Sequence, residues 1–470
     1  MEPHRRWLKE LVGNDAPVVR YSTLLGRTQI LVLDHEIVEE ILTAPAGKDT
    51  ARFQKPFFFL PEIIGKGLVT LEGEEWVKQR RIIQPSFSVA YLKESLETSV
   101  PGRVEKFVDL WKKAGEKREI DVASHLSALT LDVIGETGFS HDFQGLKDIE
   151  EWANVNSEKP ELSDPLILAM TNLLKPSLLR VFLYVIGLQD LDGIANPVTK
   201  KAKTEVNRTV DNILRFAKEK LTANDGTSSS KRSKSVLQLL FNARDAESTS
   251  GKAALTDEEL RDEIKTMILA GHETTSTWCH WALYALSKWP DVQEKLYQEV
   301  TKVAPTSTDR ITIEDVEKMD YLNAFLNETL RLFPPVGMLI RQNQYNERIA
   351  GHEIPPETML VIPIHLIHRH PKYWKQPDEF VPERWLNDEK VSKGGGGLET
   401  FRFTFLPFGA GGHACIGYRF AQLEAKLIMA NIVRSLRVEI APSQRDVEHT
   451  FTTIVTMKSK PPLKIVVKSR

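Results

Sequence analysis

Residues 405–417, Phe-Leu-Pro-Phe-Gly-Ala-Gly-Gly-His-Ala-Cys-Ile-Gly, are the stretch that decides the fold. They follow an alternating aromatic run from Phe401 that is typical of a strand, and they precede a segment in which apolar residues recur at helical spacing. Glycines at 409, 411 and 417 allow a tight loop around a single thiol, that of Cys415. A helix beginning near Gly417 would direct unpaired backbone N–H groups toward this sulfur and favour the thiolate.

Two interpretations of this loop compete. In the first, Gly409, Gly411 and Ala414 form a G-x-G-x-x-A dinucleotide fingerprint with Glu439 as the ribose acceptor. Only about 30 residues follow Glu439, too few for the further strand–helix units of a doubly wound fold. In the second, Cys415 is a metal ligand. One cysteine without Cys or His partners cannot build a tetrahedral zinc site, but one thiolate suffices as the axial ligand of a haem iron.

The strongest predicted helix begins after Thr256, which forms a capping-box pattern with Glu259, and extends to Trp289, where Pro290 stops it. Its 33 residues span roughly 50 Å, enough to cross a large domain. The middle of this helix, residues 270–275, is Ala-Gly-His-Glu-Thr-Thr and interrupts the apolar pattern. A buried acid beside a hydroxyl is costly unless it is hydrogen-bonded or functional, and the alternative is a softened kink with Glu273 in solvent.

Other segments predict a mainly helical chain with small sheets. Residues 29–33 favour a strand, and residues 76–89 and 126–138 have helical spacing. A further helix over residues 321–332 places Glu328 and Arg331 on one face, where such a pair is ordinarily solvated and contributes little to stability.

Composition narrows the function. Lys plus Arg (62) nearly balances Asp plus Glu (64), which predicts no nucleic-acid partner. The two cysteines, Cys279 and Cys415, exclude a disulfide framework and an iron–sulfur cluster. The longest apolar run, residues 181–188, is too short to span a bilayer, and residues 1–7 lack the apolar core of a secretory signal.

Taken together, these segments resemble a known family, the haem-thiolate monooxygenases called cytochromes P-450. Phe408-Gly409-x-Gly411-x-His413-x-Cys415-x-Gly417 is similar to that family's ligand loop, and Ala270-Gly271-x-Glu273-Thr274-Thr275 to its oxygen-activation motif. Glu328-x-x-Arg331 resembles its buried ion pair, Pro382-Glu383-Arg384-Trp385 the segment that completes a triad, and Trp76-x-x-x-Arg80 its propionate-binding helix. The likeness extends from about residue 20 to the C-terminus in the family's order, and the motifs resemble those of eukaryotic members, closest to the fatty-acid and xenobiotic-oxidising branches.

The resemblance implies a single catalytic domain over residues 1–470 with the cytochrome P-450 fold, mainly α with small β-sheets and a long central helix over haem b. It implies Cys415 as the iron ligand and Thr274 and Glu273 as catalytic residues. The other implied residues are, for the cofactor, Trp76, Arg80, Arg341, His413, Phe408, Gly409, Gly417, Ala270 and Gly271; for substrate, Phe57, Phe58, Met267, Val336, Met338, Leu339 and Thr453; and for structure, Glu328, Arg331 and Arg384.

The chain also departs from the family's pattern. His413 stands where most members have a propionate-binding arginine, and Ala270 replaces the glutamate that attaches haem covalently in many fatty-acid omega-hydroxylases. The sequence begins close to the first helix, without the usual hydrophobic anchor. We expect the endoplasmic reticulum membrane surface if an anchor precedes this chain and the cytoplasm otherwise. Residues 173–188 correspond to the family's apolar lid, so peripheral membrane contact is expected.

The leading interpretation is a monomeric enzyme that inserts one oxygen atom of O2 into a lipophilic molecule such as a fatty acid, terpenoid, steroid or xenobiotic, with fatty acids favoured. A hydroperoxide isomerase or dehydratase and a non-enzymatic haem sensor are the alternatives, although neither needs the Glu273-Thr274 pair. Electrons are expected from an NADPH-dependent flavoprotein reductase or a ferredoxin. A basic patch of Lys78, Arg81, Arg419 and Lys426 is the predicted docking site.

Overall fold

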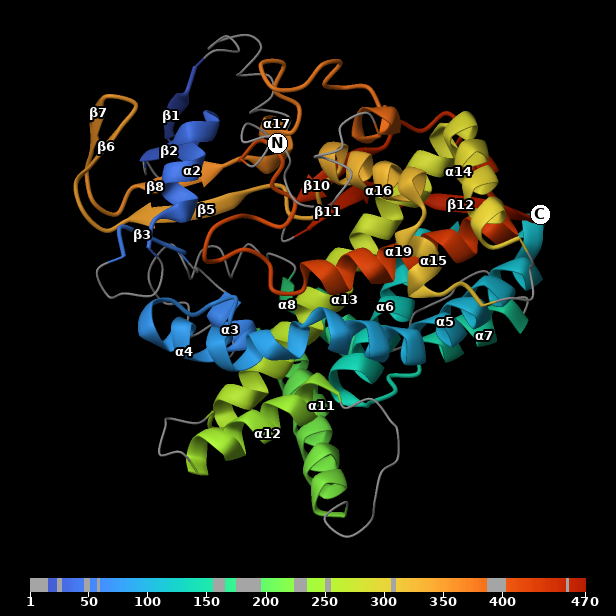
Figure 1. Cartoon of the computed structure of the whole chain (residues 1–470), viewed down its shortest axis with the longest axis horizontal. Helices are drawn as coiled ribbons and strands as arrows, with labels where there is room; N and C mark the ends of the chain where they lie inside the picture. The colour runs from blue at the N-terminus through green and yellow to red at the C-terminus, as the bar shows by residue number, and fades with distance from the viewer. Residues whose placement is uncertain are drawn as a thin grey trace.

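Helices make up most of the computed structural model, as the sequence predicts (Figure 1). It describes residues 16–22, 28–45, 51–56, 60–154, 165–174, 196–223, 235–249, 255–305, 310–386, 403–453 and 456–470. Phe57, Phe58 and most of the predicted lid lie outside the described residues, as does the side chain of Thr453.

The longest helix is α13, Asp257–Lys288. It begins as predicted, because the Thr256 hydroxyl accepts from the Glu259 N–H and the Glu259 carboxylate accepts from the Thr256 N–H. It passes through the centre of the molecule (Figure 1). Helix α6, Val122–Phe139, packs so closely on it that a Cβ atom at Gly271 would lie 2.9 Å from Ile134 Cγ1.

The other helices surround this central pair. Those that precede α13 in the sequence are α2 (His35–Thr43), α3 (Leu60–Ile64), α4 (Gly73–Ile83), α5 (Val89–Ala114), α7 (Gly145–Asn154), α8 (Pro165–Leu174), α11 (Pro197–Ala223) and α12 (Val236–Thr249). Those that follow α13 are α14 (Pro290–Val303), α15 (Ile313–Glu317), α16 (Asp320–Leu332), α17 (Ile364–Ile367) and α19 (Tyr418–Ser435).

Four small sheets complete the fold of the described residues. The largest has the strand order β1 (Val18–Ser22), β2 (Thr28–Val32), β8 (Met359–Ile362), β5 (Leu339–Asn343) and β3 (Phe53–Gln54). A three-stranded sheet has the order β4 (Ile120–Asp121), β12 (Lys464–Ser469) and β9 (Leu436–Ile440). The two hairpins are β6 (Glu347–Ile349) with β7 (His352–Ile354), and β10 (Thr450–Thr453) with β11 (Met457–Lys460).

Two predicted elements need correction. The helix expected over residues 76–89 ends at Ile83, because Pro85 has no N–H to continue it, and a 3₁₀ turn at Gln84–Phe87 separates α4 from α5. The run from Phe401 was expected to be strand-like, but residues 403–407 form a short turn leading into the cysteine loop. Its alternation of aromatic residues instead reflects packing, since Phe403 and Leu406 belong to one core cluster and Phe405 packs on others.

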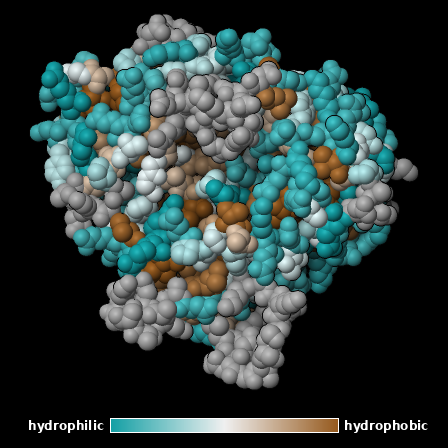
Figure 2. Space-filling model, in the orientation of Figure 1, coloured by the Kyte–Doolittle hydropathy of each residue, from teal (hydrophilic) through white to brown (hydrophobic). Residues whose placement is uncertain are grey.

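The face seen in Figure 2 is mostly hydrophilic, and its hydrophobic residues gather in the middle and lower left, over the part where Figure 1 shows α4. Within the described ranges, no helix has the length and apolar character needed to cross a bilayer.

Candidate active site

The cysteine loop joins the turn at Leu406 to helix α19. Gly409 and Gly411 have φ values of 67° and 69°, which glycine adopts without strain. Gly411 also lies against α2, where a Cβ atom would be 1.8 Å from the carbonyl oxygen of Leu42, so no side chain fits there. The Gly409 N–H donates to Leu406 O at 3.1 Å and the Cys415 N–H donates to Phe408 O at 2.9 Å. These contacts fold the loop back and present Cys415 ahead of α19.

The Cys415 thiol is solvent-accessible because it faces a cavity of about 750 Å³. Trp76 and Arg80 from α4 line this cavity, together with Ile416 and Arg419 from the loop and the start of α19. Burial of the surrounding loop raises the pKa of Cys415, while the Gly417 N–H and the Arg80 charge lower it. Without a metal the thiol therefore stays protonated, and the Gly417 N–H and the Arg80 charge are placed to stabilise the thiolate that an iron ion would create.

The middle of α13 also faces an open space. Ala270 is exposed and Gly271 and Thr274 are partly exposed, although Met267, Ile268 and Leu269 in the preceding turn are buried. Small residues exposed at the centre of a long, otherwise buried helix are consistent with a flat group lying beside it.

Cationic side chains collect around the same region. Arg341 on β5 is only 7% exposed, and Arg80 donates to Ala414 O at 3.0 Å. Burial lowers the pKa of both guanidinium groups. His413 packs on the Trp76 ring with 4.1 Å between centroids. The structure thus brings together all four residues predicted to contact the haem propionates.

Two further charged residues join this group that sequence reasoning missed. Glu72 Oε2 lies 3.3 Å from His413 Nε2, and Glu72 Oε1 lies 3.5 Å from Lys55 Nζ. Burial lowers the pKa of Lys55 to about 8. Lys55, Arg80 and Arg341 outnumber the single acid, so the cluster has a cationic excess that fits the two carboxylates of haem b. No local pattern marks Lys55 or Glu72.

Glu273 is buried and ionised. Its Oε1 accepts from Thr456 Oγ1 at 2.8 Å and lies 2.7 Å from Lys458 Nζ. Burial acts to raise the pKa of Glu273, but Lys458, His272 and Thr456 together hold it below its ordinary value. Thr274 instead donates to Ala270 O at 2.7 Å, one turn back on the same helix. The alternative of a softened kink with Glu273 in solvent is therefore excluded.

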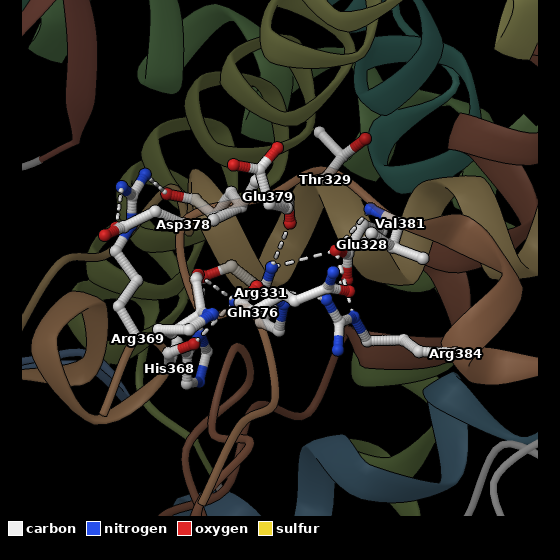
Figure 3. Close-up of polar contacts among 12 residues, drawn as sticks. Glu328, Thr329, Arg331, His368, Arg369, Gln376, Asp378, Glu379, Val381 and Arg384 are labelled. Carbon is white, nitrogen blue, oxygen red and sulfur yellow. Dashed lines mark hydrogen bonds and ion pairs between the residues drawn. The ribbon is translucent and has the colours of Figure 1, made fainter. Parts of the chain in front are cut away.

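The predicted triad forms a network in which Glu328 and Arg331 are fully buried and Arg384 is 15% exposed (Figure 3). Arg331 Nη2 and Glu328 Oε1 are 2.8 Å apart with both side chains 0% exposed, and Arg384 Nε donates to the same carboxylate at 3.1 Å. All five Arg331 N–H donors have acceptors, which are Glu328 Oε1 and Oε2 and the carbonyls of His368, Pro377 and Glu379. The pair is thus a buried anchor rather than a solvated surface contact.

The described substrate candidates lie at separate places around the site. Met267 is buried on α13, while Val336, Met338 and Leu339 are partly buried at the start of β5. Leu339 approaches the cysteine loop, since its Cδ1 would be 3.8 Å from a Cβ atom at Gly409. Phe408 packs edge-on against Trp278 with 6.0 Å between centroids.

Two buried acids have no counterpart in the predicted site. Burial raises the pKa of Glu263 to about 8, although its Oε1 accepts from the Leu68 N–H at 2.8 Å. Burial also raises the pKa of Glu424 well above its ordinary value, and Thr275 acts in the opposite direction. Both positions fall on the apolar faces of their helices, which is the sequence signal that could have identified them.

Comparison with known proteins agrees with this geometry. The profile of the family described as Cytochrome P450 matches residues 16–467. Cytochrome P450 monooxygenase 205 of Postia placenta is 29% identical over 96% of this chain and 84% of its own length. Cytochrome P450 CYP72A616 of Paris polyphylla is 30% identical over 92% of this chain and 78% of its own length. Cytochrome P450 4d8 of Drosophila melanogaster is 28% identical over 90% of this chain and 89% of its own length.

The chain belongs to the cytochrome P450 family. It is a haem-thiolate monooxygenase, whose cofactor is haem with a cysteine thiolate on the iron. The predicted family and its eukaryotic character are confirmed. Members of the family generally act on lipophilic substrates and receive electrons from a redox partner.

Proposed function

We propose that this enzyme hydroxylates a lipophilic small molecule, with a fatty acid as the favoured class, and that Cys415 is its iron ligand. The observation that carries the proposal is the placement of the Cys415 thiol in a cavity beside the N-terminus of α19, next to Arg80. Haem, when bound, supplies the activation of dioxygen. The apolar side chains of Met267, Val336 and Leu339 support a lipophilic substrate, and the motifs are nearest to the fatty-acid and xenobiotic branches.

The residues around the site have separate tasks in this proposal. Arg80, Arg341 and His413 bind the propionates, assisted by Lys55. The positive charge comes from the two arginines and the lysine, because burial lowers the pKa of His413. Thr274 presents its hydroxyl on the exposed strip of α13 and holds a proton near the reacting oxygen. Glu273 passes protons inward from the protein surface, because its partner Lys458 is 48% exposed.

The electrons enter from a separate flavoprotein reductase or ferredoxin on the cysteine side. Exposed Arg81 and Arg419 line the cavity that contains Cys415, as does the exposed Val77. Location at the endoplasmic reticulum membrane surface is supported by apolar side chains on α8 and α11, where Leu168 is 49% and Phe216 is 49% exposed. Sedimentation with microsomal vesicles would test the membrane contact.

The isomerase and sensor alternatives are less well supported. Neither needs a proton route to bound dioxygen, yet Glu273, Thr274, Thr456 and Lys458 provide ionisable and hydroxyl groups leading inward from solvent. Consumption of NADPH and O2 with formation of a hydroxylated product would support the monooxygenase. Product formed from a hydroperoxide without electron supply would favour the isomerase.

The ligand assignment is tested by Cys415→Ser. The ferrous carbonyl complex of the wild-type enzyme should have the red-shifted Soret band of thiolate ligation, and this variant should lose it. Cys279→Ser is the matched control, because Cys279 is fully buried in the core on α13 and should not affect the band. If Cys415→Ser keeps the band, Cys415 is not the ligand.

A further inference from the structure

His368 connects two parts of the molecule that lie far apart in the sequence. It follows helix α17, and its side chain is completely buried. Arg331 Nη1 donates to the carbonyl oxygen of His368 at 2.9 Å, and His368 Nδ1 lies 3.2 Å from the carbonyl oxygen of Arg331. The two residues therefore bond reciprocally, each through its side chain to the other's backbone (Figure 3).

The other ring nitrogen of His368 contacts the cysteine loop. The Leu406 N–H donates to His368 Nε2 at 2.7 Å. Because this N–H is a donor, Nε2 is the acceptor, and the imidazole proton is on Nδ1, where it donates to the Arg331 carbonyl. Burial, followed by the positive charge of Arg331, lowers the pKa of His368 to about 3, so the ring is neutral. Both ring nitrogens thus have hydrogen-bond partners in only one orientation of the imidazole ring.

Leu406 is the point at which the cysteine loop begins. Its own carbonyl accepts from the Gly409 N–H at 3.1 Å, which closes the first turn of the loop, and Cys415 follows nine residues after it. Phe405 packs its ring on His368 with 5.1 Å between centroids and on Trp385 with 4.7 Å. Trp385 donates to Glu328 at 2.9 Å. A second path therefore connects the Glu328–Arg331 pair, through Trp385, to Phe405, the residue before Leu406.

We propose that His368 is a positioning residue that fixes the start of the cysteine loop relative to the Glu328–Arg331 pair, and through it the placement of the Cys415 sulfur. Any buried imidazole needs a polar partner on each ring nitrogen, and those of His368 are backbone groups of two separate segments. The ring joins these two backbone groups, one from α16 and one from the loop, that no direct hydrogen bond connects in the described structure. This inference rests on the proposed role of Cys415.

Two substitutions separate the two bonds of the ring. His368→Asn places an amide N–H near the position of Nδ1 but has no atom that reaches Leu406. His368→Gln places an amide oxygen near the position of Nε2 but has no donor near Nδ1. Each substitution removes one buried hydrogen bond. If His368 were purely structural, the two variants would therefore lose similar amounts of stability. His365→Asn is the matched control, because His365 is also buried in α17 and bonds to Gly337 O rather than to the loop.

The variants would be compared as haem-loaded protein with two measurements. One is the rate at which the ferrous carbonyl complex loses the thiolate Soret band on mild warming, and the other is hydrogen exchange of the Leu406 amide in peptides covering residues 403–409. We expect His368→Asn to accelerate both by about tenfold, which corresponds to about 1.4 kcal/mol and to the low end for a buried N–H without an acceptor. His368→Gln and His365→Asn should stay within about twofold of wild type.

Equal effects of His368→Asn and His368→Gln, or an effect of neither, would overturn the inference. If His368→Asn does not accumulate, the tautomer can be measured in the wild-type ferrous carbonyl enzyme by ¹⁵N NMR of labelled histidine, with His368→Gln identifying the signal. A proton on Nε2 would then exclude the bond from Leu406. If Cys415→Ser loses the thiolate band and the two His368 variants change both measurements equally, only this inference is overturned. If Cys415→Ser keeps the band, the proposed iron ligand is overturned.

Discussion

Lys458 on the β10–β11 hairpin lies 2.7 Å from Glu273 on the central helix, with 48% of the lysine side chain exposed and only 10% of the glutamate. The same hairpin contacts α13 three more times, through Thr456 with Glu273, through Ser459 with His280 and through the Met457 carbonyl with the Trp281 indole. The acid beside Thr274 is therefore fixed by a C-terminal hairpin and connected by Lys458 to the surface. Its charge depends on a residue nearly 200 positions away in the sequence.

Replacing Lys458 by Gln should raise the pKa of Glu273, since the lysine charge counteracts the effect of burial. An opposite charge at this distance typically changes a pKa by about one unit or more. In wild type the lowered pKa contributes stability above the unfolded-state pKa, and this is lost as pH falls through the folded pKa. In Lys458→Gln the effect of burial on Glu273 dominates and raises its folded-state pKa above the unfolded-state value. The free energy of unfolding of this variant should therefore fall as pH rises. The difference in unfolding midpoint between the two proteins should therefore widen from pH 5 to pH 8.

Lys460→Gln is the control for this experiment, because Lys460 is exposed two residues along the same strand. A midpoint difference that does not change with pH would mean that Lys458 does not set the charge of Glu273.

The sequence predicted the central helix well because its signals are local. A capping box at Thr256 and a proline at 290 mark both ends, and the observed helix stops one residue before the predicted end. The ion pair is different. Glu328 and Arg331 have a spacing that is ordinary for a solvated helix, and only the resemblance to a family indicated burial. The partners that bury them, Val381, Arg384 and Trp385, come from more than 50 residues away.

The residues that were missed share this non-local character. Lys55 and Glu72 come from two segments and meet the predicted His413 from a third, and each of the two missed residues alone is an ordinary polar residue next to or within a loop. Their meaning appears only when the fold places them together, where burial makes unpaired charge costly. His368 is similar, because its two partners are 37 and 38 residues away on opposite sides.

Thr274→Ala should leave haem and substrate binding intact but lower the amount of product per NADPH consumed, by about tenfold if the hydroxyl directs a proton. The missing reducing equivalents should appear as hydrogen peroxide. Thr277→Ala is a close control, since Thr277 makes the same bond one turn back, to Glu273 O at 2.8 Å, but is buried. Unchanged coupling in Thr274→Ala would remove this hydroxyl from proton delivery.

Glu328→Ala should destabilise the protein by about 3 to 5 kcal/mol, because it strands the charge of Arg331 in the core. The unfolding midpoint and the haem content of the purified protein would measure this. Glu314→Ala provides the comparison, since Glu314 pairs with Lys318 on the surface with side chains 78% and 57% exposed. That change should cost about 0.5 kcal/mol or less. A haem-loaded Glu328→Ala variant of wild-type stability would contradict the buried-anchor role.

Glu263 should make the protein less stable in alkaline solution. Its folded-state pKa of about 8 lies above the ordinary value of 4.5, so the folded protein binds the proton more tightly and stability falls as pH rises between these values. The whole interval corresponds to about 5 kcal/mol as an order of magnitude. Glu263→Gln keeps an acceptor for the Leu68 N–H and removes the charge, so its midpoint should exceed that of wild type at pH 8 and approach it at pH 5. Parallel profiles would show that Glu263 does not carry this dependence.

Electron supply should depend on charge at the cavity that contains Cys415. Of the four predicted basic residues, Lys78 is neutralised by Glu259, with 2.9 Å between Nζ and Oε1, and burial lowers the pKa of Lys426. Arg81 and Arg419 line the cavity and are exposed, so the docking prediction moves to them. Arg419→Glu should raise the apparent KM for a separate reductase several-fold while substrate binding stays unchanged, and the effect should shrink as salt rises, because screening acts within roughly 8 Å at physiological ionic strength.

The matched control for Arg419→Glu is Lys302→Glu, an exposed charge reversal near the end of α14, which should not change the KM for reductase. Steady-state turnover at varied reductase and salt concentrations would make the comparison. Equal KM values for Arg419→Glu and wild type at low salt would exclude this patch as the docking site. Turnover with NADPH and substrate but no added partner would contradict the need for a separate electron donor, because charge at Arg419 affects the rate only if a second protein must approach the cysteine side of the molecule.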